Sequence, residues 1–238
     1  MKTKVSVIVP ALNEEKYLAP CLRSIVGQRT SLEYEIIVVD SGSKDRTEEV
    51  ARKYADLFIN TKKRGIALAR NTGANNAKGQ LFVFVDADTK IPPNYIDAVH
   101  AVMEEKTLAG LSCAFKFDKA SRSLNAAQEL SNKYLLVKGS FGKGEILGFN
   151  NAVRRETFFR AGGFPDAPLE DGAFAKKLRG IGRVIYLPEP MVTTSARRLE
   201  SGGTLKAAFY YANLMLATNF PHTPLKSLLR YKKYLPIR

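Results

Sequence analysis

Leu81-Phe82-Val83-Phe84-Val85-Asp86-Ala87-Asp88 is the segment that decides the fold. Its first five residues, mostly β-branched or aromatic, predict a buried strand over 81–85. In an open α/β sheet, the carboxyl ends of the strands form the crevice that binds ligands. Two carboxylates at such an end can hold a hard cation such as Mg²⁺, which takes its remaining ligands from substrate phosphates. Asp86 and Asp88 therefore predict a site for a divalent cation and a diphosphate.

A second interpretation of Asp86 and Asp88 involves no metal. An aspartate after a strand can accept hydrogen bonds from nearby backbone N–H groups, either as a helix cap or in a turn. The Asp-x-Asp pattern alone does not separate the two interpretations. The rest of the chain has to decide between them.

Working outward from this strand, the sequence alternates between strand and helix patterns. Strands are expected at 4–10, 35–40, 57–59 and 81–85, and helices after 13–15 and over 48–54 and 65–78. Asp45 is expected to cap the helix over 48–54, with Glu48 as its capping-box partner. Such alternation gives a mostly parallel sheet with right-handed crossovers. We therefore expect an α/β, Rossmann-like fold with helices on both faces of the sheet.

The second half of the chain is less regular. We expect a helix after Pro92-Pro93, a strand over 108–117, helices over 154–160 and 173–179, and a strand over 184–187. The basic, glycine-interrupted segment 118–147 is left without an element. We divide the chain into one domain over 1–200, with a nucleotide-binding half at about 1–90 and an acceptor half at about 91–200. A helical, basic C-terminal appendage is expected over 201–238.

Length and composition limit the class of protein. The 238 residues, of which 45% are hydrophobic, are enough to build a real core. Cys21 and Cys113 form no metal or redox spacing, so we expect two buried thiols in a reducing compartment. The N-terminus lacks the organisation of a signal peptide, and no stretch is long and apolar enough to span a membrane. A cytoplasmic protein, in solution or peripheral on the cytoplasmic face of the membrane, is therefore expected.

The net charge of +14 fits nucleic acid, anionic lipid or a phosphorylated substrate as a partner. Zinc ligands and RNA-binding aromatic motifs are absent, so no nucleic acid is expected. After Glu200 there are six basic residues and no acidic one, and this basic segment favours an anionic membrane surface. The apolar stretch 204–220 fits core packing or a homo-oligomer contact instead.

Four segments in order resemble glycosyltransferase family 2, whose members are inverting enzymes with a nucleotide-diphospho-sugar transferase (GT-A) fold. These segments are Val5-Ser6-Val7-Ile8-Val9-Pro10 with Ala11-Leu12-Asn13-Glu14-Glu15, Ile36 to Thr47, Asp86-Ala87-Asp88, and Leu169-Glu170-Asp171 followed by Gly182. The resemblance covers about residues 3–195. It implies a donor that is a nucleotide-diphospho-sugar, with either uridine or guanosine as the base, and a divalent cation, Mn²⁺ or Mg²⁺.

The resemblance also implies roles on the nucleotide side. Nucleotide binding is assigned to Pro10, Ala11, Asn13, Glu14, Asp40, Arg64, Asn71 and Asp86. Asp40 would contact the base or ribose, although an aspartate at this position can also cap a turn. Arg64 can equally be a solvated cation, and Asn71 an ordinary surface amide. Asp88 would coordinate the metal directly, while Asp86 would bridge ribose and metal.

The remaining assignments concern the transfer itself. Asp171 is expected to be the general base, with Glu170 as the alternate, and a capping box is the competing interpretation of the pair. Sugar or acceptor binding is assigned to Gly148, Asn150 and Asn151, and a lid over the diphosphate to Arg197 and Arg198. Many relatives use a later histidine as a metal ligand, but His100 lies at the wrong place and His222 follows a helix-breaking proline, which leaves the third metal ligand open.

We therefore expect a metal-dependent inverting transferase that moves one sugar to a sugar, lipid-linked or small-molecule acceptor. The Gln-x-x-Arg-Trp signature of processive polysaccharide synthases is absent, which favours a single transfer over polymerisation. A retaining transferase or a nucleotidyltransferase on the same fold remains an alternative. A non-catalytic protein that binds sugar nucleotides is the other alternative.

Overall fold

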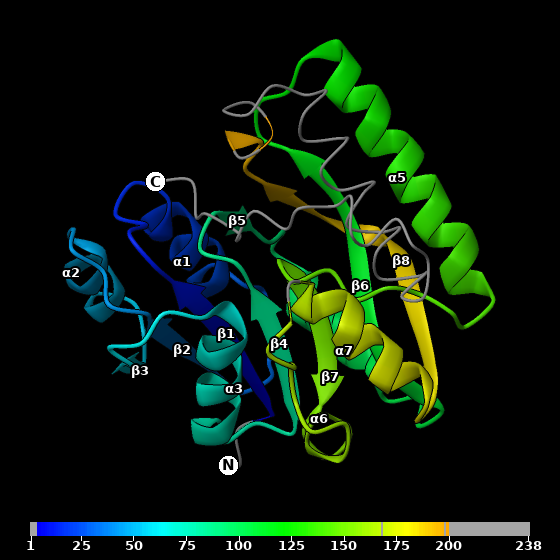
Figure 1. The fold of residues 1–238 in the computed structure, drawn as a ribbon, viewed down its shortest axis with the longest axis horizontal. Coiled ribbons are helices and arrows are strands. Elements are labelled where there is room, and N and C mark those ends of the chain that lie inside the picture. The colour runs from blue at the N-terminus through cyan, green and yellow to red at the C-terminus, as the bar shows by residue number, and fades with distance from the viewer. Residues whose placement is uncertain (1–3, 168, 198, 200–238) are drawn as a thin grey trace, which may run out of the picture.

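The computed structural model describes residues 4–167, 169–197 and 199. It shows one central sheet with helices packed on both faces (Figure 1). The strands are β1 (Val5–Ala11), β2 (Tyr34–Asp40), β3 (Leu57–Asn60), β4 (Leu81–Val85), β5 (Thr89–Lys90), β6 (Leu108–Phe117), β7 (Asn150–Arg154) and β8 (Arg183–Thr194). The helices are α1 (Leu18–Val26), α2 (Thr47–Arg52), α3 (Ile66–Asn76), α4 (Tyr95–Met103), α5 (Arg122–Ser140), α6 (Arg155–Arg160) and α7 (Glu170–Arg179).

The strand order is β3-β2-β1-β4-β7-β6-β8-β5. β1 pairs in parallel with β2 and β4, β2 pairs in parallel with β3, and β6 pairs in parallel with β8. β7 is antiparallel to both of its neighbours, and the short β5 is antiparallel to β8. The expected mostly parallel α/β sheet is confirmed. The sheet runs without interruption from the first half of the chain into the second.

Alternation along the buried strands builds two apolar layers. In β1, Val5, Val7 and Val9 face a core made with α1, α2 and α4, whereas Ile8 faces the core made with α3, α6 and α7. This period of two is what a strand covered on both faces requires. α3 approaches β1 closely, because a Cβ on Gly73 would lie 2.4 Å from Ile8 Cγ2. Only glycine allows this approach.

Several elements differ from the sequence prediction. The segment 118–147, left unassigned above, contains the long helix α5, and Asn150–Arg154 forms a strand where only a loop was expected. β8 continues well beyond the predicted 184–187. Asp45 does not cap α2, whose N-cap is Arg46; its carboxylate accepts the Thr47 N–H at 3.0 Å just before the helix.

The topology brings the ends of three strands to one edge of the sheet. Ala11 at the end of β1 lies beside Asp40 at the end of β2, and β4 on the other side of β1 runs directly into Asp86. Cys21 and Cys113 are buried free thiols, as expected. In the described part of the chain, no helix has the length and apolar character needed to cross a membrane. The predicted appendage 201–238 lies outside the described residues.

Candidate functional site at the carboxyl edge of the sheet

Arg70 of α3 lies at the centre of the candidate site, with a side chain only 2% exposed. Its Nη2 donates to Asp86 Oδ1 at 2.9 Å, and its Nη1 donates to Glu170 Oε1 at 2.7 Å. The guanidinium carbon also lies 5.1 Å from the centroid of the Phe164 ring. Burying a charge is costly unless it is paired, and these two carboxylates provide the pairing. Arg70 thus joins the end of β4 to the start of α7.

Asp171 lies beside this ion pair and makes different contacts. Its Oδ2 accepts the Gly148 N–H at 3.2 Å, and its Oδ1 accepts the Gly172 N–H at 2.7 Å. Burial, followed by the negative charge of Glu170, raises the pKa of Asp171 to about 6, although Arg70 and the two N–H groups act in the opposite direction. A carboxyl group with a pKa near neutrality is suited to accept a proton from a hydroxyl group.

The capping-box interpretation of Glu170 and Asp171 does not match the geometry. Both residues lie in the first turn of α7, whose N-cap is Leu169, and no side chain caps this helix. The two carboxylates are also distinct: Glu170 is paired with Arg70, whereas Asp171 accepts backbone N–H groups. Of the two, Asp171 has the environment of a base.

Asp88, two residues after Asp86, is paired with another arginine. Arg197 Nη2 lies 2.9 Å from Asp88 Oδ2, and the same guanidinium forms an ion pair with Glu14 from the loop after β1. The guanidinium carbon lies 4.2 Å from the centroid of the Tyr17 ring. The segment after β8 is thereby brought onto the ends of β1 and β4. Arg198, the other predicted lid residue, lies outside the described side chains.

The loops after β1 and β2 are tied together where the nucleotide contacts were predicted. Asn13 has a positive φ of 55°; its N–H donates to Ser43 Oγ, and its Oδ1 accepts the Lys44 N–H, both at 2.8 Å. Asp40 is 1% exposed and accepts the Ser43 N–H at 3.0 Å and Asn60 Nδ2 at 3.1 Å. These contacts of Asp40 are those of the turn-cap interpretation, and its nucleotide role stays a prediction.

Three predicted amides form hydrogen bonds inside the protein. Asn71 bridges the backbone N–H and carbonyl of Phe164 at 2.9 and 2.8 Å. Asn150 is fully buried and makes the same kind of bridge to Cys113, at 2.7 and 2.8 Å. Asn151 is also fully buried, and its Nδ2 donates to Leu147 O at 2.9 Å. These side chains therefore fix the backbone at Phe164, Cys113 and Leu147, and their ligand roles stay predictions.

Gly148 lies between Asp171 and Arg70, where no side chain would fit. Its N–H binds Asp171, and a Cβ at this position would lie 2.6 Å from Arg70 Nη2. Arg64, in contrast, is exposed in the loop before α3. His100 lies on α4, with Nδ1 4.0 Å from Glu104 Oε1, and His222 lies outside the described residues.

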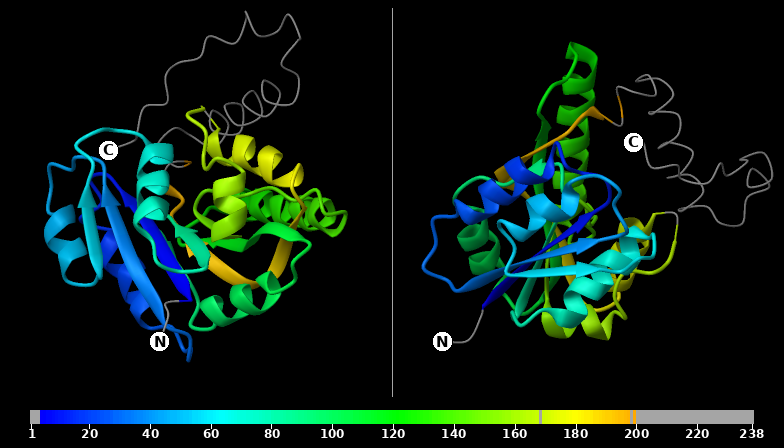
Figure 2. Two further views of the ribbon diagram at one scale, coloured as in Figure 1. Left: turned by 90° about the horizontal axis from the view of Figure 1, so that it is seen from below. Right: turned by 90° about the vertical axis from the view of Figure 1, so that its left-hand side faces the viewer.

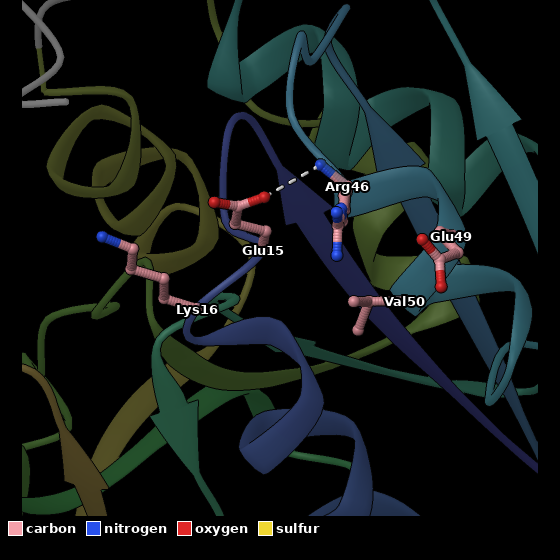
Figure 3. A pocket seen from close by; sticks show the side chains of 5 residues that line it. All are labelled: Glu15, Lys16, Arg46, Glu49 and Val50. Carbon is pink, nitrogen blue, oxygen red and sulfur yellow. Dashed lines mark hydrogen bonds between the residues drawn. The ribbon is translucent and has the colours of Figure 1, made fainter.

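A hollow of about 610 Å³ lies beside the loop after β1, next to α2 (Figure 3). It is lined by Glu15, Lys16, Arg46, Glu49 and Val50. The Arg46 N–H donates to Glu15 Oε2 at 3.2 Å across it. None of the predicted site residues lines this hollow, so the candidate site does not extend into it.

The donor set at the end of β4 suits a hard divalent cation. Asp86 and Asp88 offer carboxylate oxygens, the ligands that Mg²⁺ and Mn²⁺ prefer, and their side chains are 18% and 9% exposed. Within the described ranges, no group of three or more His, Cys, Asp or Glu side chains could hold a metal. Among the described residues, Asp86 and Asp88 are thus the protein groups placed to hold a cation here.

Arg70 is the central residue that sequence reasoning missed. The sequence interpretation treated the helix over 65–78 as alanine-rich and considered only Arg64 as a cation. A signal was nevertheless present: Ala67, Arg70 and Ala74 share one helical stripe, and Ala67 and Ala74 are buried against the sheet. An arginine on the sheet-facing stripe of a helix needs buried carboxylates as partners.

Comparison with known proteins agrees with this architecture. The family model described as Glycosyl transferase family 2 matches residues 6–161. The glycosyltransferase GlyA of Streptococcus pneumoniae is 38% identical over 107 residues, which is 43% of this chain and 15% of GlyA. A dolichol-phosphate mannosyltransferase of Pyrococcus furiosus is 41% identical over 98 residues, covering 39% of this chain and 28% of that protein.

The fold has a counterpart among solved structures. A mannosyltransferase from Pyrobaculum calidifontis, solved with GDP-Man and Mn²⁺, superimposes with a TM-score of 0.68 at 25% identity, covering 82% of this chain and 57% of that chain. In all three of these proteins, the matched part is less than two-thirds of the relative's own length. The curled sheet with flanking helices is the GT-A arrangement expected from the sequence.

Proposed function

The chain belongs to glycosyl transferase family 2, and from this premise we propose that it moves one sugar from a nucleotide-diphospho-sugar to an acceptor hydroxyl group with inversion. The observation that carries the proposal is the joint placement of Asp86 and Asp171 around Arg70. A carboxylate for the donor side and a base for the acceptor side thus share one buried cluster.

The base step follows from the environment of Asp171. In the proposed reaction, the acceptor hydroxyl group gives its proton to Asp171 while its oxygen forms a bond to the anomeric carbon. The bond from that carbon to the diphosphate oxygen breaks, and the nucleoside diphosphate leaves with the electron pair. A single displacement inverts the anomeric configuration. The pKa of about 6 lets Asp171 be ionised at neutral pH and still bind a proton in the transition state.

The donor side is proposed to use the ends of β1, β2 and β4. Asp40 and the linked loops carrying Asn13 and Glu14 would hold the base and ribose. Asp88 and Asp86 would hold a divalent cation, which when bound stabilises the negative charge of the departing diphosphate. Arg197 is close enough to Asp88 to contact the same diphosphate, as guanidinium groups pair well with phosphate oxygens.

Relatives support the choice of donor and acceptor classes. The Pyrobaculum calidifontis enzyme binds GDP-Man with Mn²⁺, which supports a GDP-linked or similar nucleotide sugar and a divalent cation as the starting point here. The Pyrococcus furiosus relative is named for dolichol phosphate, which supports a lipid-linked acceptor and a peripheral position on a membrane. The chain is also compatible with a homo-oligomer. No observation favours a retaining transferase or a nucleotidyltransferase over the inverting transferase.

The test is ligand-induced stabilisation followed by product analysis. The full chain is melted with UDP-, GDP- and other sugar nucleotides, in the presence of Mn²⁺, Mg²⁺ or a chelator. A ligand at 100 times its dissociation constant should stabilise the fold by about 2.7 kcal/mol. The stabilising donor is then incubated with acceptors, and NMR of the product gives its anomeric configuration. Retention of configuration would exclude the inverting step, and no shift with any nucleotide would exclude the site.

A further inference from the structure

The long helix α5 carries an apolar row on its outer face. Leu130, Tyr134, Val137 and Phe141 are 71%, 51%, 60% and 75% exposed. Their spacing of four, three and four residues places them along one side of the helix and its C-terminal cap, over about 16 Å. We call these four residues the α5 stripe. Exposed apolar groups of this kind, gathered on one face, mark an interaction surface.

The inner face of α5 explains why the stripe points outward. Gln128 accepts the Phe117 N–H at 2.7 Å, and Asn132 bridges the N–H and carbonyl of Phe115 at 3.3 and 2.8 Å. Two amide side chains thus satisfy the backbone of β6, whereas Leu, Tyr, Val and Phe side chains face away from the protein. Leu124 and Leu135 are buried on the same inner face, so α5 has apolar residues on both its buried and its exposed side.

Basic residues surround the stripe. Lys133 is exposed on the helix face next to it, and Lys138, which forms an ion pair with Glu145, lies on the other side. Over 116–145 the chain has six basic residues and three acidic ones, namely Lys116, Lys119, Arg122, Lys133, Lys138 and Lys143 against Asp118, Glu129 and Glu145. An apolar row between lysines can insert into the boundary of a membrane while the charges meet acidic headgroups.

We propose that the α5 stripe docks on an anionic lipid surface. Charge separates this occupant from two others. A second copy packed through the same face would bring the lysines of both copies together. The segment 201–238 of this chain contains the apolar stretch 204–220, but its six basic residues and lack of acidic ones do not complement the same lysines. Anionic headgroups complement both the lysines around the stripe and the basic segment 201–238.

Docking through α5 orients the molecule with respect to the acceptor. α5 packs on β6 and β8, in the half of the sheet beyond β7, and it lies along the outer edge of the molecule away from α1 and α2 (Figures 1 and 2). The acceptor half would therefore be the part nearest the lipid. This last step rests on the proposed function, because it makes the acceptor a lipid-linked molecule presented from that surface.

The experiment is co-sedimentation of the full chain with vesicles of phosphatidylcholine alone or of phosphatidylcholine with phosphatidylglycerol. The wild type should bind only the acidic vesicles, and less at high salt. The double variant Leu130→Ser/Val137→Ser should lose about tenfold in partitioning, because two apolar contacts are removed. The matched control is Val26→Ser/Leu68→Ser, two exposed apolar residues on α1 and α3, which should bind as the wild type does.

Other outcomes overturn the docking proposal. Wild-type binding that survives in the α5 variant would assign the membrane contact to another part of the chain. Equal loss in the Val26→Ser/Leu68→Ser control would show non-specific adsorption. A wild-type dimer that the α5 variant converts to a monomer would make a second copy the occupant. Melting with sugar nucleotides reads the donor site separately, so failure of the docking proposal and of the proposed function can be told apart.

Discussion

A single residue separates Asp86 from Asp88, yet they form ion pairs with two arginines that differ in burial. Arg70, which holds Asp86, comes from a core helix and is 2% exposed; Arg197, which holds Asp88, comes from the segment after the last strand and is 21% exposed. Arg70 also pairs with Glu170, and this group of three side chains is part of the core. The two carboxylates are 18% (Asp86) and 9% (Asp88) exposed, so the large difference in exposure is between the two arginines.

The unequal burial of Arg70 and Arg197 shows how a protein can keep acidic groups together at a site for an anionic substrate. A buried arginine fixes one carboxylate permanently, because removing either partner leaves an uncompensated charge. Arg197 is 21% exposed, so its guanidinium can exchange a carboxylate partner for another anion more readily than the buried Arg70 can. Asp88 is therefore the carboxylate better able to exchange its counter-ion for a metal. The predictions below test this division.

The largest effect is expected from Arg70→Met, which should lower the free energy of unfolding by about 3–5 kcal/mol. The variant leaves Asp86 and Glu170 buried without their cation. Urea denaturation at neutral pH measures the loss. Arg70→Lys keeps the charge but not the two-pronged guanidinium, so its free energy of unfolding should lie between those of the wild type and Arg70→Met. A loss below about 1 kcal/mol for Arg70→Met would mean that the ion pairs of Arg70 stabilise the fold no more than a solvent-screened pair does.

Asp171→Asn should lower kcat by about a thousandfold, because a general base contributes roughly 10²–10⁴ in rate. The same variant should be more stable than the wild type at pH 7. The folded pKa of about 6 lies above the ordinary value, so ionised Asp171 destabilises the fold at pH 7, and this cost disappears as pH falls from about 6 towards 4. Turnover assays and melting curves at pH 7 and pH 4.5 measure both effects.

A stabilised but inactive Asp171→Asn protein would separate catalysis from folding at this residue. If the variant instead keeps more than a tenth of the wild-type rate, Asp171 is not the base. The Asn variant should also keep the melting shift with the donor nucleotide, since the substitution leaves Asp86 and Asp88 in place.

The strand pattern and end-of-strand chemistry were predictable because they depend on local sequence. Val-Ile and Phe-Val runs specify buried strands wherever they occur, and a carboxylate after such a strand lies at the ligand edge of any parallel sheet. Asp40, Asp86 and Asp88 follow from this reasoning alone. The separation of Glu170 from Asp171 does not, because it depends on which carboxylate Arg70 contacts.

The missed elements depend on tertiary contacts. α5 places Gln128 and Asn132 against β6 and carries an exposed apolar row besides its buried leucines, so its sequence shows no single apolar face. Asn150 looks like a turn-forming amide in sequence, yet it is fully buried and bridges the backbone of Cys113. In both cases the partner of an amide side chain is a distant strand, which sequence spacing does not reveal.

Glu170→Gln should shift the pH dependence of the proposed reaction rather than abolish it. The base must be ionised, so kcat/KM should rise with pH through about 6 in the wild type. Removing the negative charge of Glu170 lowers the pKa of Asp171, because Arg70 and the N–H groups of Gly148 and Gly172, which also lower it, remain in place. The midpoint should move to lower pH in a kcat/KM profile. A midpoint that stays fixed or rises would mean that Glu170 does not act on the base.

The smallest effect on stability is expected at Arg197. Arg197→Gln should lower the free energy of unfolding by less than Arg70→Met does, because the Arg197 side chain is 21% exposed whereas that of Arg70 is 2% exposed. Its effect should instead appear in metal binding without nucleotide. Arg197 neutralises Asp88 and Glu14, so its removal leaves more negative charge for Mn²⁺, and calorimetry should show a several-fold lower dissociation constant.

Asp88→Asn is the matched control for Arg197→Gln, because it removes the other partner of the same pair. It should weaken Mn²⁺ binding with and without nucleotide, whereas Arg197→Gln should strengthen binding of the ion alone and weaken it in the presence of the nucleoside diphosphate, which loses a phosphate contact. Opposite signs for the two variants would identify Arg197 as the counter-ion that the metal replaces. Equal losses in both, together with a loss of several kcal/mol in stability, would show that both arginines are fixed parts of the core.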